Sequence, residues 1–381
     1  MILNTQADNK HWASVWGNAV SIGENRPESY GKNITLRYDI YSPFAGDSLR
    51  ITFDNYCGTE SITITRSSYF GKEGFVPITF EGKESVTVPA GERRISDPVR
   101  TIVEAGSNSC VSFYLGDFTQ MRSAVYTCGP LTKGTYAVGD YTYEEEIPIA
   151  VSRKTGITYF LSNVSVYTEK TNRTIVCYGD SITAQDWPDY LNLRIKEEGY
   201  AHTAAIRRAT SGSRILREYD CLTYASYGLK GSRRFAYEVP TDGADTVLIQ
   251  QGINDIIHPV GTDVNPFRPM SDLPTAAELI DGLKYYIDLA KGMGYKVYVG
   301  TLLPIKGWRT YAPFRDVLIG EYNEFIRTTE LIDGVVDFAA ALCDPDEPIA
   351  FAAQYDSGDH LHPSALGYRR MAEAVPAKLL W

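Results

Sequence analysis

The feature of this sequence that most limits its fold is a change in hydrophobic periodicity near residue 170. Before that point, apolar residues alternate with polar ones in short runs, at residues 34–40, 49–53, 62–64, 86–88, 111–115 and 157–167. A period of two places the apolar side chains on one face of a half-buried strand. Turn signals containing glycine separate the runs, and no clear helical pattern lies among them. We therefore predict an antiparallel β-sandwich domain in residues 1–170.

Beyond a polar linker at residues 168–173, strands and helices are predicted to alternate. Continuous apolar runs, typical of parallel strands buried on both faces, lie at 175–178, 247–249, 296–303 and 335–338, and a further candidate strand covers 202–208. Helical spacing is present at 188–198, 279–291, 311–328 and from Pro363 onward, where Pro363 suits a first helical position. This alternation predicts right-handed crossovers and a doubly wound α/β domain in residues 171–381.

Charge and composition exclude several classes of protein. The chain has 37 Lys and Arg against 47 Asp and Glu, a net charge of −10, which argues against binding to duplex nucleic acid or to an anionic membrane surface. No apolar run is long enough to span a membrane, and the first ten residues do not resemble a signal peptide, so we expect a cytoplasmic protein unless a leader was removed. The six cysteines include no C-x-x-C pair, which favours free thiols over a zinc ribbon or a disulfide scaffold.

A serine follows the predicted strand at 175–178 directly, in the sequence Gly179-Asp180-Ser181-Ile182. In open α/β sheets, functional sites lie at the carboxyl ends of strands. A serine at the start of a helix also benefits from the positive end of the helix dipole, and Gly179 permits the tight turn that would present its hydroxyl group. Taken alone, these four residues fit a nucleophile and an ordinary helix N-cap equally well.

Two further loops follow predicted strands. Gly212 lies after the strand at 202–208, and a glycine N–H can approach a reacting carbonyl because no Cβ intervenes. Asn254 lies after residues 247–251, and its side-chain amide could donate to an oxyanion. By themselves, an ordinary loop glycine and an Asn-Asp turn explain these two residues at least as well.

The last motif is Asp359-His360-Leu361-His362-Pro363, before the predicted C-terminal helix. A histidine that acts as a general base needs an acceptor on its other ring nitrogen, and Asp359 can turn back to His362 to provide one. The alternative is that His360 and His362 bind a metal ion. Two ligands make a poor site, and the remaining histidines show no zinc-like spacing.

The order of these motifs, with three at predicted strand ends, resembles the SGNH (GDSL) hydrolase superfamily from about residue 174 to the C-terminus. The resemblance implies a flavodoxin-like three-layer α/β/α fold, with Ser181 as the nucleophile, His362 as the base and Asp359 as its orienting acid. It also implies an oxyanion hole made by the N–H groups of Ser181 and Gly212 and by the side-chain amide of Asn254. Neither a metal nor an organic cofactor is expected.

The front half is similar to the N-terminal β-domain of a bacterial subset of this superfamily, through residues 12–18, 33–37, 48–65 and 85–99. Some carbohydrate esterases, acetylxylan-type enzymes included, pair a jelly-roll-like domain with an SGNH domain, so we expect a jelly-roll-like sandwich. One departure is that only residues 184–186 separate Thr183 from Trp187, where many relatives have a longer loop. We expect the wall beside Ser181 to be short and open, or completed by another segment.

The resemblance implies a serine carboxylic-ester hydrolase. We predict short-chain, chiefly acetyl, esters of a small molecule or oligosaccharide as substrates; the alternative is a lipolytic or general short-chain esterase. A carbohydrate-binding module fused to an inactive hydrolase would require a missing catalytic residue, and all are present. Trp187, His258 and Trp308 are candidates to line the substrate site, as is Asp180, which we expect rather to brace its loop. Ordinary packing explains each of them equally well. A homo-oligomer is compatible with the sequence.

Overall fold

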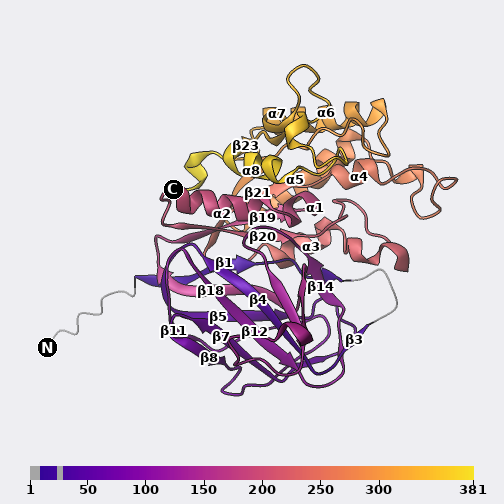
Figure 1. Ribbon diagram of the computed structural model, residues 1–381. Helices are drawn as coiled ribbons and strands as arrows, with labels where there is room; N and C mark the ends of the chain where they lie inside the picture. Colours follow the sequence, from indigo (N-terminus) through magenta and orange to yellow (C-terminus); the bar gives the residue numbers. More distant parts are fainter. Residues whose placement is uncertain (1–8, 24–28) are drawn as a thin grey trace.

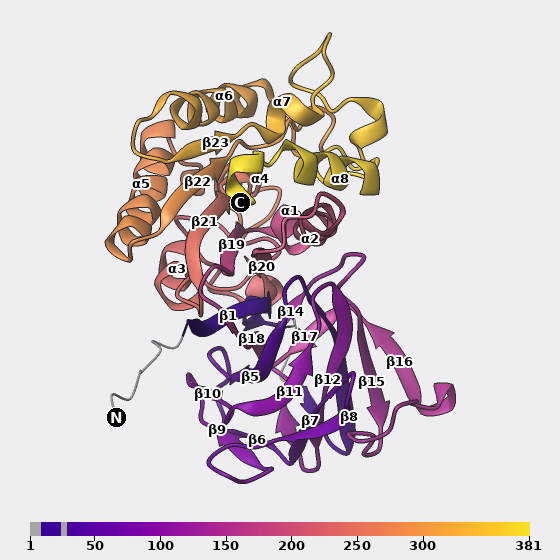
Figure 2. The same cartoon turned by 90° about the vertical axis from the view of Figure 1, so that its left-hand side faces the viewer.

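The computed structural model describes residues 9–23 and 29–381, and its two halves differ in architecture (Figure 1). The first half is built from antiparallel strands, and the second is a parallel sheet with helices on both faces (Figure 2). The strand β18 (Leu161–Glu169) ends the first half and β19 (Arg173–Gly179) begins the parallel sheet. The predicted polar linker is therefore shorter than expected, because residues 168 and 169 still pair with β1.

Two antiparallel sheets face each other in the first half. One has the order β1 (Lys10–Gly17), β18, β5 (Gly46–Asp54), β10 (Arg93–Ile95), with β11 (Val99–Val103) also pairing with β5. The other has the order β16 (Ser152–Thr155), β15 (Gly134–Val138), β4 (Ile34–Ser42), β12 (Ser107–Leu115), β7 (Arg66–Gly71), β8 (Gly74–Ile78). The rings of Phe53 and Phe113, one from each sheet, meet edge to face with centroids 4.9 Å apart. The predicted sandwich is confirmed.

Short strands complete this half. They are β2 (Ser21–Ile22), β14 (Ser123–Tyr126) and β17 (Ile157–Tyr159) in one small sheet, β3 (Tyr30–Gly31) with β13 (Thr119–Gln120), and β6 (Ile62–Ile64) with β9 (Val86–Val88). The apolar positions of the alternating runs form the core: Leu36, Ile40, Leu49, Ile51 and Val111 are almost completely buried. Period-two patterning therefore places these side chains between the sheets.

The second half contains a five-stranded parallel sheet in the order β20 (Thr203–Ala209), β19, β21 (Ala244–Gln250), β22 (Lys296–Gly300), β23 (Gly334–Val336). Numbered along the chain this order is 2-1-3-4-5, the flavodoxin-like arrangement that was predicted. The chain leaves β19 to form β20 on one side and later forms β21 on the other. Ligands of such sheets bind beyond the carboxyl ends of the strands at this reversal.

Eight α-helices are described in this half. They are α1 (Ser181–Ala184), α2 (Trp187–Glu197), α3 (Gly231–Glu238), α4 (Ile253–Ile257), α5 (Ala276–Gly292), α6 (Pro313–Thr328), α7 (Phe338–Leu342) and α8 (Ala365–Ala374). The four longest predicted helical patterns correspond to α2, α5, α6 and α8. Among the described residues, no helix is long and apolar enough to cross a bilayer.

Three boundaries near the C-terminus differ from the prediction. The strand expected at 335–338 ends at Val336, because Asp337 accepts a hydrogen bond from Ala340 N and caps α7. The last helix begins at Ala365 behind the Ser364 cap, so Pro363 precedes the cap and does not occupy the first helical position. That helix also stops at Ala374, before Pro376, so Val375 and Leu379, whose four-residue spacing from Met371 favoured a longer helix, lie outside it.

Candidate active site

Ser181, His362 and Asp359 form a hydrogen-bonded relay beyond the carboxyl end of β19. Ser181 Oγ lies 2.9 Å from His362 Nε2. His362 Nδ1 lies 2.7 Å from Asp359 Oδ2. A carboxylate on Nδ1 favours the tautomer that carries its proton there, which leaves Nε2 free to accept the serine proton. The structure thus brings together the three residues predicted as nucleophile, base and orienting acid.

The turn that presents Ser181 is fixed from both sides. Gly179 closes β19, where a Cβ would lie 2.4 Å from the carbonyl oxygen of Gln250 on β21. Asp180 is the N-cap of α1, and its Oδ1 accepts a hydrogen bond from Ile182 N. Ser181 is the first residue of α1, so its N–H belongs to the helix end that lacks an intrahelical acceptor. Asp180 therefore braces the loop, as its sequence position led us to expect.

Gly212 and Asn254 flank the serine from the two neighbouring strands. Gly212 follows β20 with a φ of 77°, a conformation that favours glycine. Thr210 N donates to Gly179 O at 3.2 Å, which ties the Gly212 loop to the Ser181 turn. Asn254 lies in the first turn of α4 after β21, and one of its two amide hydrogens is engaged with Ser213 O at 3.1 Å. Among residues 9–23 and 29–381, the N–H groups of Ser181 and Gly212 have no hydrogen-bond acceptor.

A buried network supports the Gly212 loop from below. Ser213 Oγ accepts hydrogen bonds from Arg234 Nη1 at 3.1 Å and from Gln251 Nε2 at 2.9 Å. Arg234 also forms a fully buried ion pair with Glu238 at 2.7 Å on α3. Side chains held by several partners cannot shift independently, so the loop is preorganised for donating to a developing charge.

The loop that carries Asp359 and His362 is held by the aspartate itself. Asp359 Oδ1 accepts from the backbone N–H groups of Leu361 and His362. Burial alone would raise the pKa of Asp359, but the hydrogen bonds from the His362 side chain and from these N–H groups hold that pKa below its ordinary value. His360 points elsewhere, with its Nδ1 2.5 Å from Asp356 Oδ2. Within the described part of the chain, no group of three or more His, Cys, Asp or Glu side chains could hold a metal ion.

The structure places the residues predicted to line the substrate site in different environments. Trp187 is fully buried against Phe338, with ring centroids 5.5 Å apart, so its side chain is part of the core and the expectation for it is wrong. The Trp308 ring lies edge-on to His362 at 6.5 Å and is partly exposed. His258 lies one helical turn after Asn254 and stacks on Tyr227 at 5.1 Å.

A cluster of tyrosines and arginines beside Gly212 was not predicted. Tyr219, Tyr224 and Tyr227 pack against one another, and Tyr219 and Tyr227 also pack against His258. Arg214 and Arg268 lie over two of these rings. The close tyrosine spacing in residues 219–227 was a visible signal, but nothing in the sequence placed Arg268 next to it.

The short connection between α1 and α2 is covered by the first half of the chain. Cys128 N donates to Ala184 O, and Arg207 on β20 donates from Nη2 to the carbonyl oxygens of both Cys128 and Gln185. Asp189 accepts from Leu131 N at 2.8 Å and pairs with Arg207 at 2.8 Å. Of the two expectations for this region, completion by another segment matches the structure.

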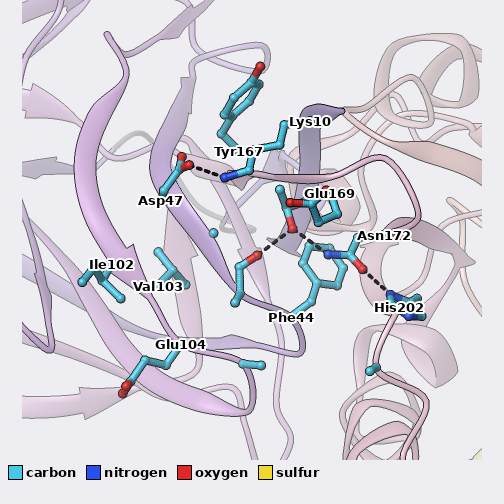
Figure 3. A pocket seen from close by; sticks show the side chains of 15 residues that line it. Lys10, Phe44, Asp47, Ile102, Val103, Glu104, Tyr167, Glu169, Asn172 and His202 are labelled. Carbon is cyan, nitrogen blue, oxygen red and sulfur yellow. Dashed lines mark hydrogen bonds and ion pairs between the residues drawn. The ribbon is translucent and has the colours of Figure 1, made fainter. Parts of the chain in front are cut away.

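One cavity among the described residues lies away from the relay. It has a volume of about 630 Å³ and is lined by Lys10, Asp47, Glu104, Tyr167, His202 and neighbouring residues (Figure 3). Asn172, which precedes β19, also lines it, so it lies toward the amino end of the strand whose carboxyl end presents Ser181. Its side chains are largely paired, as in the Lys10–Asp47 ion pair at 2.5 Å. Its described lining residues contain no nucleophile–base pair.

Comparison with known families agrees with this geometry. Residues 177–370 match the profile of the GDSL-like Lipase/Acylhydrolase family. The chain belongs to this family. The matched segment runs from the end of β19 into α8, so it includes the relay and both flanking loops of this GDSL-like hydrolase.

Solved structures similar to this GDSL-like hydrolase share little sequence with it. A GDSL-like lipase of Bacteroides thetaiotaomicron is 18% identical over 56% of this chain and 90% of its own, with a TM-score of 0.37. A lipase from a goat rumen metagenome is 16% identical over 54% and 97%, also with a TM-score of 0.37. A Bacillus subtilis protein is 15% identical over 97% and 87%, with a TM-score of 0.37. Among curated proteins, no sequence matches significantly.

Proposed function

We propose that this GDSL-like hydrolase is a serine esterase that removes short acyl groups, chiefly acetyl, from hydroxyl groups of a carbohydrate. The observation that carries the proposal is the relay of Ser181, His362 and Asp359, with contacts of 2.9 and 2.7 Å. Distances in this range allow direct proton transfer between nucleophile and base.

In the proposed reaction, Ser181 Oγ attacks the ester carbonyl carbon while His362 Nε2 accepts the hydroxyl proton. The oxyanion that forms is held by the N–H groups of Ser181 and Gly212 and by the free amide hydrogen of Asn254. His362 passes the proton to the departing alcohol, which leaves an acyl-serine. Water then attacks the acyl-serine and gives a proton to His362, which returns it to Ser181 as the carboxylic acid departs.

The side chains around the oxyanion loop support a short acyl group. Tyrosines, His258 and two arginines gather beside Gly212, whereas a long acyl chain would need an aliphatic surface. Aromatic faces combined with polar groups suit sugar rings. This arrangement favours a polar alcohol portion and a small acyl group.

One observation favours a lipolytic alternative. The segment between α4 and α5 carries exposed Val264, Phe267 and Met270, of which Val264 is 70% exposed. An exposed apolar patch near a site can contact lipid. The alternative predicts faster cleavage of long acyl esters.

One set of measurements tests both the acetyl esterase proposal and the lipolytic alternative. We expect Ser181→Ala to lower kcat on 4-nitrophenyl acetate by about 10⁶-fold, because removing the nucleophile removes the covalent route. Ser61→Ala, an exposed serine of the first half, serves as a control that should keep full activity. For the wild type, kcat/KM should fall from acetate through butyrate to octanoate. Retained activity in pure Ser181→Ala protein contradicts the mechanism, and faster octanoate cleavage replaces the acetyl proposal by the lipolytic one.

A further inference from the structure

Several buried polar side-chain atoms next to the oxyanion loop have no hydrogen-bond partner within the described residues. They are Arg214 Nε, Tyr219 OH, His258 Nδ1 and Arg268 Nε. Leaving a buried polar group unpaired costs free energy, so such groups in one place indicate a missing partner. Except for His258, whose role depends on its tautomer, each of these atoms can donate a hydrogen. The missing partner is therefore rich in acceptors.

These atoms belong to one cluster. The Arg214 guanidinium lies 4.2 Å from the Tyr219 ring centroid, and that of Arg268 lies 4.3 Å from the Tyr224 centroid. Tyr219 is 5.8 Å from His258, and Tyr227 stacks between His258 and Tyr224. Arg268 Nη2 donates to Tyr227 OH at 3.3 Å. Aromatic faces thus hold both arginines in fixed orientations.

One ring links the cluster to the reaction site. A Cβ added to Gly212 would lie 2.1 Å from Tyr227 Cδ1, so the Tyr227 ring lies directly against the expected oxyanion donor. The hydroxyl end of the same ring contacts Arg268. A group bound at Arg268 therefore lies one aromatic ring away from a carbonyl held at Gly212.

The cluster is positively charged although the whole chain has a net charge of −10. Arg214 is 3% exposed and pairs with Asp272 at 3.1 Å, an acid that also faces Arg217. Arg268 is 9% exposed, and no acidic side chain pairs with it among residues 9–23 and 29–381. Desolvation first, then the charges of Arg268 and Arg214, hold the pKa of His258 well below its ordinary value. A buried guanidinium without a counter-charge is costly unless a ligand supplies one.

We propose that Arg268, together with Arg214 and Tyr219, binds an anionic group, a carboxylate or a phosphate, on the alcohol portion of the substrate. This inference rests on the proposed esterase function and narrows its substrate class to acidic alcohols, such as a sugar that carries a carboxylate. The planar guanidinium presents parallel donors that match the oxygens of such a group. A neutral sugar would leave the charge of Arg268 uncompensated.

The first test compares kcat/KM for an acetylated oligogalacturonate with that for a neutral acetylated xylo-oligosaccharide. The wild type should prefer the acidic ester, and Arg268→Gln should lower the acidic-to-neutral ratio about 10- to 100-fold, since a hydrogen bond to a charged group is worth about 1.5–3 kcal/mol. Arg268→Lys keeps the positive charge but loses the two parallel N–H donors of the guanidinium. Its acidic-to-neutral ratio should therefore lie between those of the wild type and Arg268→Gln. Arg233→Gln, which removes an exposed arginine on α3, is the matched control and should keep the wild-type ratio. An unchanged ratio in Arg268→Gln overturns the proposal.

The second test does not depend on hydrolysis. Full-length Ser181→Ala protein is titrated calorimetrically with oligogalacturonate, with inorganic phosphate and with neutral xylo-oligosaccharide. Anion binding that weakens with added salt and is lost in Ser181→Ala/Arg268→Gln supports the site, even if no ester is cleaved. The anion that binds with the higher affinity shows whether the site prefers a carboxylate or a phosphate. Equal binding of neutral and anionic ligands overturns the site. If an anion binds but wild-type protein cleaves no ester, the proposed function fails alone.

Discussion

At the scale of single residues, Asp180 shows how a side chain next to the proposed nucleophile can serve the fold. Its Oδ1 caps Ile182, while its Oδ2 is buried and has no hydrogen-bond partner in the described part of the chain. Burial raises the pKa of Asp180 to about 7, and the nearby Asp255 carboxyl adds to the rise. The protonated form is therefore favoured in the folded protein, where it costs less to bury.

This predicts a specific pH dependence for Asp180→Asn. Because the folded state holds the Asp180 proton more tightly than the unfolded state, the contribution to the free energy of unfolding is present below about pH 4 and lost as pH rises through about 7. Asn keeps the capping oxygen but never ionises, so the variant should gain on the order of 2 kcal/mol relative to wild type between pH 5 and pH 8. Urea unfolding at both pH values measures this. Asp281→Asn, at an exposed aspartate of α5, should show no such trend. A pH-independent difference for Asp180→Asn would contradict the account.

Individual residues differ in how far sequence could place them. Ser181, Gly212, Asn254 and the Asp359–His362 pair were identifiable because a motif's chemistry depends on local spacing at strand ends. The burial of Trp187 could not be predicted, because it depends on packing against Phe338 from another element. Arg268 was missed for the same reason: its ring partners lie about 40 residues away in sequence.

At the scale of elements, α5 shows how a local signal fixes a helix start. Thr275 accepts from Glu278 N, and Glu278 accepts in return from Thr275 N, which forms a capping box. Leu279, Leu283, Ile287 and Ala290 recur at helical spacing and are buried. The periodicity predicted only the later part of this helix, from residue 279, because the capping box itself is polar.

We expect Thr275→Ala to lower the free energy of unfolding by about 1 kcal/mol, because an N-cap side chain is worth about that much. Thr262→Ala, at an exposed position in the loop before α5, is the control and should change stability by less than about 0.5 kcal/mol. Urea titrations followed by circular dichroism give both values. Equal effects of the two substitutions would show that the capping box does not stabilise α5.

Other elements show where local patterns stop being informative. The strand at 335–338 was predicted too long because Phe338 is apolar in either a strand or a helix, and only the cap at Asp337 decides. The helix α3 was missed because its residues are mostly polar, and its buried Arg234 and Glu238 satisfy each other. Buried charged residues do not contribute to the apolar periodicity from which a helix is predicted.

At the scale of the whole molecule, Arg208 joins the two halves of the chain. It lies on β20 and is almost fully buried, and its guanidinium donates to the carbonyl oxygens of Asn18, Ser162 and Glu238 and to Asn163 Oδ1. Two of these segments belong to the sandwich and one to α3. The Glu238 side chain then pairs with Arg234, which supports Ser213 in the Gly212 loop. The sandwich thus braces the active-site loop.

We therefore expect Arg208→Met to lower the free energy of unfolding by about 3 kcal/mol, because several buried acceptors lose their donor at once. Arg50→Met removes a more exposed arginine that also bridges the halves, to Asp242 at 2.7 Å, and should cost about 1 kcal/mol. Chemical denaturation monitored by fluorescence distinguishes the two. A loss below about 0.5 kcal/mol for Arg208→Met would mean that the halves are held together by other contacts.

The architecture of both halves was predictable from periodicity, but the contact between them was not. Period-two runs and alternating strands and helices each report a local structure. The interface uses buried polar groups such as Arg208 and Asn163, and polar residues in a sequence look like surface residues until their partners are known. The domain limits at residues 170 and 171 remain a prediction.

The pairing of β1 with β18 has a consequence for how the protein is made. Ser14 and Ser165 are hydrogen-bonded across this pair although 151 positions separate them in the chain. At about 5–20 residues per second, a ribosome needs roughly 8–30 s to produce the second strand after the first. During that interval β1 lacks the strand with which it pairs. The earliest described strand to be synthesised is thus among the last to complete its pairing, and we expect its backbone edge to stay open to association with other chains until then.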